Sequence, residues 1–334
     1  MQPVQQLEGI KGADLTDDIL YSEQPLVLKG LASHWPITEA GKQGFKSACE
    51  YLMSTYSGEP VIASYGAPEN NGRVFYNQDF SGFNYQAAKL PLAQVLQTLA
   101  KHLDDETPPT VYMGSTDARR WFPKLLEDNQ FQIPNVNPLT SVWLGNQTRI
   151  AAHFDFPTNL ACNVVGRRRF TLFPPEQIEN LYPGPLEFAP GGQAISLVDF
   201  NEPDYVQFPK FKQALEQAMV AELEPGDALV VPSMWWHHVE GLDPFNVLIT
   251  HWWRDTPHYM GKPDHALHAA ILALRSLPKE QRQAWKAIFE HYIFNDELDT
   301  QDYIPEPARD ILNYPLNENS ARKIRADLLN KLKR

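Results

Sequence analysis

Residues 148–156 read TRIAAHFDF and stand in the middle of a series of short runs rich in β-branched and aromatic residues. Gly, Pro and Asn separate the runs, and this spacing is typical of an all-β barrel or sandwich. The other runs are VYMGS (111–115), VWLGN (142–146), RRRFTLFPP (167–175), GDALVVPS (226–233) and FNVLITHWW (245–253). The sequence therefore predicts a β-core over residues 110–256.

The segments on either side of this core are predicted to be mainly helical. Before it, a short strand is expected in QPLVLKGL (24–31), and helices are expected between Phe45 and Tyr56 and from Pro91 onward. We accordingly divide the chain into an N-terminal α/β elaboration at 1–109, the β-core at 110–256 and a helical region at 257–334.

The C-terminal region carries three expected helices. Asp264 is expected to cap a helix that runs through Arg275, Pro278 to open a second, and a third to begin at about Ser320. Within the core, the Pro- and Gly-rich segment from Pro183 to Pro209 is long for a loop, and such loops are often functional lids or binding loops.

The composition is that of a globular protein, with 43% apolar and 21% charged residues in a chain of 334. The formal charge of −12 disfavours nucleic acid as a partner, because such a surface repels phosphate. The N-terminus has no basic start or apolar segment, and no run of eighteen apolar residues occurs, so we expect a cytoplasmic protein without a membrane span. With only Cys49 and Cys162 present, any metal site must use His and carboxylate ligands.

His153 and Asp155 lie two residues apart in a predicted strand, so their side chains should project from the same face. A 2-His-1-carboxylate iron site needs such a pair and one further histidine. The triplet alone is weak evidence, because an exposed pair on an edge strand would have the same pattern.

The segment EPGDALVVPSMWWHHV (224–239) supplies candidates for the third ligand. Pro-Gly-Asp predicts a tight turn, ALVVP a strand, and histidines follow at the end of this segment. His237 and His238 would point to opposite faces of an extended chain, so only one can be a ligand, and alternation by itself leaves open which.

Several motifs in order make the chain similar to the Jumonji C hydroxylases, and in particular to asparaginyl hydroxylases of the factor-inhibiting-HIF type and their bacterial cupin-like relatives. The resemblance extends from about Pro25 to Arg254 and includes GRVFYNQDFSGFN (72–84), NLACNVVGRRRFTLFPP (159–175) and SLVDFNEPDYVQFPKF (196–211). It implies a double-stranded β-helix, the jelly-roll core of cupins, with flanking helices.

The resemblance also implies a set of site residues. It places iron(II) on His153, Asp155 and His237, and 2-oxoglutarate beside Tyr112, Asn159, Arg168 and His251. Three positions depart from the family pattern: Arg168 stands where lysine is usual, Ile150 where the asparaginyl hydroxylase has threonine, and His251 where it has asparagine. Ile150 removes one hydrogen bond to the co-substrate.

The implied activity is hydroxylation of a protein side chain or a small molecule, with decarboxylation of 2-oxoglutarate to succinate. One alternative is a metal-binding cupin that acts as a binding or regulatory module without turnover, which Arg168 and Ile150 favour. Another is a cupin enzyme that uses no co-substrate, although such cupins usually hold their metal with three or four histidines. The C-terminal helices resemble a dimerisation pair, so a homodimer is expected through Leu267, Ile271, Leu274, Trp285 and Ile288.

Overall fold

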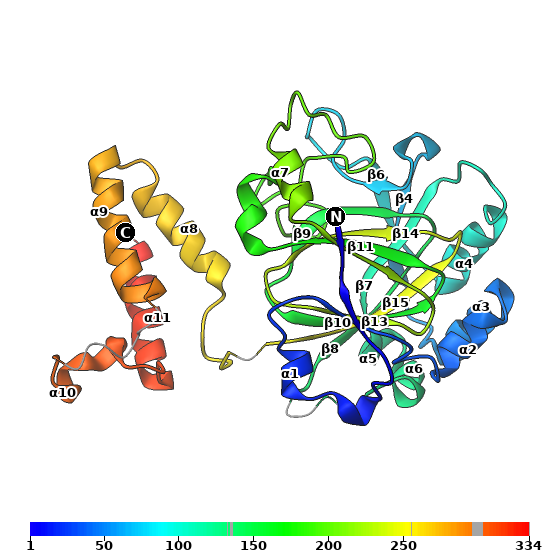
Figure 1. Ribbon diagram of the computed structural model, residues 1–334, viewed down its shortest axis with the longest axis horizontal. Coiled ribbons are helices and arrows are strands. Elements are labelled where there is room, and N and C mark those ends of the chain that lie inside the picture. Colours follow the sequence, from blue (N-terminus) through cyan, green and yellow to red (C-terminus); the bar gives the residue numbers. More distant parts are fainter. Residues whose placement is uncertain (132, 134–135, 255, 296–302, 334) are drawn as a thin grey trace. The chain divides into compact units, whose positions relative to one another are not determined.

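The computed structural model describes residues 1–131, 133, 136–254, 256–295 and 303–333 (Figure 1). The chain divides into two compact units, Met1–Arg254 and Asp255–Arg334. The first unit contains every predicted site residue, and two large sheets form its centre. Within the part of the chain that is described, every helix falls short of the length and apolar character that a bilayer crossing needs.

The first sheet has six strands in the order β1-β12-β11-β14-β9-β5. Its members are β1 (Gln2–Pro3), β12 (Met219–Leu223), β11 (Arg168–Phe173), β14 (Trp236–Gly241), β9 (Arg149–Phe154) and β5 (Arg73–Val74). The four strands from β12 to β9 pair antiparallel, and β9 and β14 lie side by side. This sheet therefore brings together the two segments that carry the predicted metal ligands.

The second sheet has nine strands in the order β2-β3-β13-β10-β15-β8-β7-β4-β6. Its members are β2 (Gln5–Leu7), β3 (Leu26–Leu28), β13 (Ala228–Val231), β10 (Thr158–Val165), β15 (Asn246–Trp253), β8 (Leu139–Gly145), β7 (Thr110–Asp117), β4 (Val61–Gly66) and β6 (Tyr85–Leu90). From β8 to β15 the chain alternates between the two sheets, except that β11 and β12 are neighbours in the first. This is the jelly-roll order of a double-stranded β-helix.

The space between the two sheets holds a compact apolar core. Phe170 and Leu172 enter it from β11, and Leu229 and Val231 enter it from β13. Because strand side chains alternate between faces, this cluster identifies which residues of each strand point into the barrel. The predicted fold class, mainly β with flanking helices around a jelly-roll core, is confirmed.

Helices cover the outer face of the nine-stranded sheet, where their apolar sides join a second and larger core. These are α2 (Pro36–Lys42), α3 (Phe45–Thr55) and α4 (Leu92–Lys101). The last two occupy the segments predicted from helical spacing. Pro91 is the N-cap of α4, where a proline costs no helical hydrogen bond. The remaining helices of this unit are short: α1 (Asp17–Leu20), α5 (Ala118–Trp121), α6 (Pro123–Asp128) and α7 (Phe211–Glu216).

The second unit contains α8 (Pro263–Leu274), α9 (Lys279–Phe289), α10 (Glu306–Arg309) and α11 (Glu318–Leu332). The prediction that Asp264 caps α8 is wrong, because Lys262 is the N-cap and Pro263 occupies the first turn. α11 begins two residues before the predicted Ser320, since the side chain of Asn317 accepts a hydrogen bond from the Ser320 backbone at 2.9 Å.

Candidate functional site

Neighbouring strands place His153 and His237 against each other. His237 of β14 pairs directly with His153 of β9, and the centres of their rings lie 4.4 Å apart. The next pair along joins Val239 to Ile150, so β9 advances three residues while β14 advances two. This bulge in β9 lets both Ile150 and His153 face the barrel interior although they stand three positions apart, where regular alternation would point them to opposite faces.

Asp155 lies directly after β9, and the turn that precedes β14 holds it in place. The backbone N–H of Met234 donates to the carbonyl of Asp155 at 2.9 Å, and the hydroxyl of Ser233 donates to the carbonyl of Phe156 at 2.6 Å. Met234 has a φ of 68°, a left-handed conformation uncommon for a residue with a side chain. The two ligand segments are thereby tied to each other through their backbones.

The donor atoms of His153, Asp155 and His237 all lie within 4.8 Å of one another. In a facial octahedral set with metal–donor bonds of about 2.1 Å, neighbouring donors lie about 3.0 Å apart, so each pair of donor atoms would have to approach by at most about 2 Å. The Nδ1–H of His153 donates to the carbonyl of Ala151 at 2.9 Å, and that of His237 to the carbonyl of Trp235 at 3.0 Å. These bonds leave both Nε2 atoms as free acceptors for a metal.

The electrostatics of the three side chains suit a divalent cation. Burial, together with a smaller effect of the neighbouring His237, lowers the pKa of His153 to about 4. Burial on its own raises the pKa of Asp155, but its contacts with His237, His153 and Gln193 outweigh that effect and bring the pKa to about 2. At neutral pH the set therefore offers a neutral imidazole and a carboxylate, the donor types that non-haem iron(II) accepts.

His238 lies on the opposite face of β14 from His237. Its ring packs against Phe200 with 4.5 Å between ring centres, and burial lowers its pKa to about 3. Neither ring nitrogen has a hydrogen-bond partner among the described residues. The structure thus brings His237, and not His238, to His153 and Asp155.

Arg168 is the most distinctive polar residue of the barrel interior. It is 4% exposed and stands at the start of β11, on the same face as the core residues Phe170 and Leu172. Its Nε donates to the side-chain oxygen of Asn163 at 3.3 Å, and no carboxylate among the described residues pairs with it. Burial lowers its pKa to about 10, so it remains a cation at neutral pH.

Two further predicted co-substrate residues share this interior with Arg168. Burial raises the pKa of Tyr112, whereas the positive charge of Arg168 lowers it, so the two groups lie close together. Asn159 is buried on β10, two residues from the core residue Ala161, and its side-chain oxygen has no partner among the described residues. Tyr112, Asn159 and Arg168 are therefore gathered on the inward faces of three strands.

His251 is not brought to this group. Its ring contacts Trp35 and Phe131, with ring centres 6.0 and 6.3 Å away, and its Nδ1 faces the carbonyl of Leu160 at 3.3 Å. These contacts lie on the helix-covered face of the sheet. The sheet therefore separates this ring from the barrel interior, where the predicted co-substrate role would require it to lie.

The residues beside His251 on β15 face inward instead. The hydroxyl of Thr250 accepts a hydrogen bond from the indole of Trp143 at 2.8 Å, and Trp252 meets the same indole edge-on with 5.6 Å between centres. Trp143 and Ile150 both pack on the interior core. Alternation along β15 would have predicted that Thr250 and Trp252 face the barrel interior, if one inward-facing residue of that strand had been known.

The segment from Pro183 to Pro209 covers the outer face of β9 and β14. Val198 joins Ala152 and Trp236 in one buried cluster, and Phe188 packs with Tyr76 and Phe83 in an aromatic group. One residue of this segment reaches the metal ligands: the amide of Gln193 donates to Oδ1 of Asp155 at 2.5 Å. The sequence could not predict this contact, because the residues of a loop follow no periodic pattern from which their position relative to a strand could be inferred.

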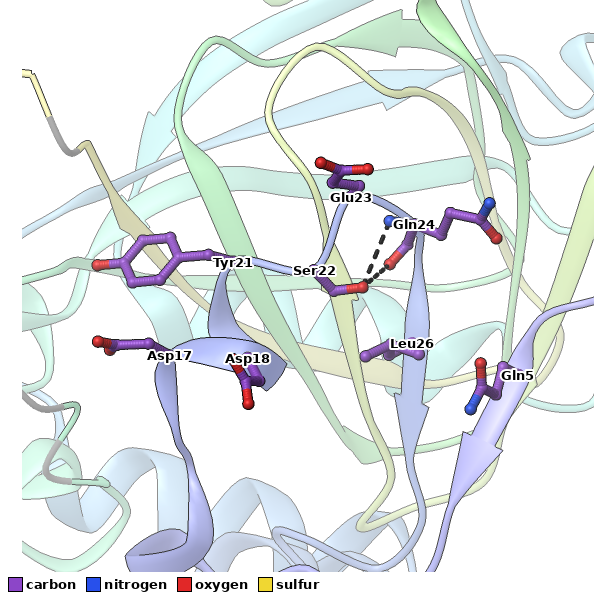
Figure 2. A pocket seen from close by; sticks show the side chains of 8 residues that line it. All are labelled: Gln5, Asp17, Asp18, Tyr21, Ser22, Glu23, Gln24 and Leu26. Atoms are coloured by element: carbon purple, nitrogen blue, oxygen red, sulfur yellow. Dashed lines mark hydrogen bonds between the residues drawn. The ribbon is translucent and has the colours of Figure 1, made fainter.

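A separate surface pocket of about 560 Å³ lies beside β3 and α1 (Figure 2). Its lining includes the carboxylates of Asp17, Asp18 and Glu23, and the hydroxyl of Ser22 donates to the carbonyl of Gln24 at 2.8 Å. None of the predicted site residues lines it. Within the described residues, His153, Asp155 and His237 form the one cluster of three or more His, Cys, Asp or Glu donors close enough to hold an ion.

Comparison with known proteins finds several whose sequences are similar to this chain. Human HSPB1-associated protein 1 is 31% identical over 50% of this chain and 36% of its own length. The lysine-specific demethylase JMJ31 of Arabidopsis thaliana is 24% identical over 77% of this chain and 50% of its own length. The tRNA wybutosine-synthesizing protein 5 of Gallus gallus is 26% identical over 84% of this chain and 90% of its own length.

The chain thus spans half or less of the length of the human and Arabidopsis relatives. The family model described as the Cupin-like domain matches residues 13–259, a range that contains both sheets' jelly-roll strands and the His153–Asp155–His237 cluster. The chain therefore belongs to the Cupin-like domain family.

Proposed function

We propose that the protein is an iron(II)- and 2-oxoglutarate-dependent oxygenase that hydroxylates a protein side chain or a small molecule. The observation that carries the proposal is the combination of a His-Asp-His donor set with a buried cation, Arg168, that has no carboxylate partner among the described residues. Three protein donors leave half of an octahedral ion open for a co-substrate and dioxygen. An unpaired buried cation is costly, and a bound dicarboxylate would neutralise it.

In this proposal each interior residue has a defined task. Iron(II) supplies the oxidation of an unactivated C–H bond, coupled to conversion of 2-oxoglutarate into succinate. His153, Asp155 and His237 hold the ion, and Arg168 and Tyr112 hold the distal carboxylate of the co-substrate. Ile150 and Trp143 keep water from the space between the metal ligands and the residues that hold the co-substrate, because both are apolar side chains of the interior core.

The relatives' names limit the substrate class only loosely. Two matched relatives are named lysine-specific demethylases, and one is named for tRNA wybutosine synthesis. We favour a protein or small-molecule substrate, because the net charge of −12 opposes binding of a polyanion. The exposed acidic side chains Glu202 and Asp204 of the long loop would suit a cationic substrate. The cytoplasmic location remains a prediction from the sequence.

Co-substrate titration tests the proposed function against the alternative of a cupin without turnover. We expect the anaerobic iron(II) protein to develop a weak visible charge-transfer band as 2-oxoglutarate is added, and to form succinate slowly under air without a substrate. Absorption spectroscopy and succinate quantification measure the two results. A protein that binds iron(II) but gives neither signal would be a binding module, and the oxygenase proposal would be wrong.

We further propose that the C-terminal unit makes the protein a homodimer. Leu267 of α8 and Trp285 and Ile288 of α9 are exposed, and large apolar side chains in one unit are typical of an interface. Light scattering should give a mass near twice 38.0 kDa. The double variant Trp285→Glu and Ile288→Glu should give the monomer mass, whereas Gln283→Glu, on another face of α9, should leave the dimer intact. A monomeric unmodified protein would contradict this proposal.

A further inference from the structure

Gln193 makes an unusual contact for a loop residue, because it binds the one carboxylate of the candidate metal site. Its amide nitrogen donates to Oδ1 of Asp155 at 2.5 Å, while Oδ2 of the same carboxylate faces Nε2 of His237 at 3.6 Å. The two oxygens of Asp155 are thus in different surroundings. One has a hydrogen-bond donor from the loop, and the other points to the position that an ion would occupy.

The loop that carries Gln193 is fastened on both sides of this residue. Gly184 donates its backbone N–H to Ile195 at 2.9 Å, and Ser196 donates to the carbonyl of Ala152 in β9 at 2.7 Å. The hydroxyl of Tyr76 donates to the carbonyl of Phe188 at 2.7 Å. Gln193 is therefore three residues from an anchor on the very strand that precedes Asp155, which fixes where its amide can reach.

The contact bears on how many positions of the ion stay open. A carboxylate can bind a cation through one oxygen or through two. With one oxygen, three positions remain, enough for a bidentate 2-oxoglutarate and dioxygen, whereas binding through two oxygens removes the last of these. An N–H donor on Oδ1 competes with the ion for that oxygen.

We propose that Gln193 is a positioning residue that restricts Asp155 to one-oxygen binding and so preserves the open position for dioxygen. The inference rests on the proposed function and deepens it. It also gives the long loop a chemical role, since displacement of Gln193 would free the second oxygen of Asp155.

The test counts water molecules on Mn²⁺ bound in place of iron, using the proton relaxation rate of bulk water. In the unmodified protein about three exchangeable waters are expected, and about one with saturating 2-oxoglutarate. Gln193→Met keeps the side-chain volume but removes the donor. We expect it to retain Mn²⁺ within about threefold, to lose one water in each state, and to form succinate about 10–100-fold more slowly.

Gln193→Asn, whose amide is one methylene shorter, should behave in the same way and guards against a folding defect of the first variant. Gln207→Met is the matched control, because Gln207 is exposed in the same loop, and it should change none of these values. Unchanged relaxation in both Gln193 variants would overturn the inference and leave the proposed function intact. Loss of Mn²⁺ from the variants would also overturn it. An unmodified protein that binds no metal would overturn both.

Discussion

His237→Leu is expected to abolish metal binding, with the affinity for Mn²⁺ or iron(II) falling at least about a hundredfold. Loss of a residue that only supports a ligand already costs about 10–100-fold, and His237 is a ligand itself in the proposed site. Its Nε2 is the donor nearest to Asp155, at 3.6 Å from Oδ2. Isothermal titration with Mn²⁺ measures the effect, and succinate formation should vanish with it.

His238→Leu provides the matched control, because the same substitution then falls on the adjacent residue and on the other face of β14. The ring of His238 is buried against Phe200, with neither nitrogen hydrogen-bonded to a described residue, so an apolar side chain of similar size replaces it at little cost. Metal affinity should stay within about threefold of the unmodified protein. Equal losses in the two variants would show that the metal site lies elsewhere.

Arg168→Met should give the second large effect, on the co-substrate and not on the metal. Removing one partner of a buried charge pair costs about 2–5 kcal/mol, which corresponds to a roughly 30-fold to few-thousand-fold weaker binding of 2-oxoglutarate. Titration of 2-oxoglutarate into the Mn²⁺-loaded protein measures this loss. Without co-substrate, the variant should be at least as stable as the unmodified protein, because it no longer buries an unpaired cation.

Arg169→Met is the control for this prediction. Arg169 follows directly in β11 but points outward, where it pairs with Glu222 at 2.7 Å, and surface ion pairs contribute about 1 kcal/mol or less. The Arg169→Met variant should bind 2-oxoglutarate with the same affinity as the unmodified protein. If Arg168→Met bound 2-oxoglutarate as tightly as Arg169→Met does, the co-substrate would not be held by the interior cation, and the assigned binding mode would be wrong.

The sequence predicts the β-core well because turn residues and β-branched runs delimit most of its strands. The helices α3 and α4 were also predictable, since their apolar residues recur at helical spacing on one face. The strand pattern predicted His153 and Asp155 as metal ligands, and it limited the third ligand to one of two histidines. The choice between His237 and His238 required either the family resemblance or the observed pairing of β14 with β9.

Three features lay beyond sequence reasoning for physical reasons. The strand FNVLITHWW is apolar on both faces, because helices cover one side and the barrel core the other, so its pattern cannot tell that His251 points outward. The contact of Gln193 with Asp155 depends on the path of a loop with no periodic structure. The unpaired state of Arg168 is a property of its surroundings, and the run Arg167–Arg169 predicts a solvated charge equally well.

The bulge in β9 gives this strand one residue more than regular alternation needs between Ile150 and His153. Were one residue deleted from this interval, the two would stand two positions apart, and regular alternation would still point both side chains into the barrel. Were two residues deleted, the imidazole would turn to the outer face with every metal-binding amino acid still present. Homologues one residue shorter at this point would therefore keep the centre, whereas those two residues shorter would have lost it, and counting conserved ligands alone would not tell them apart.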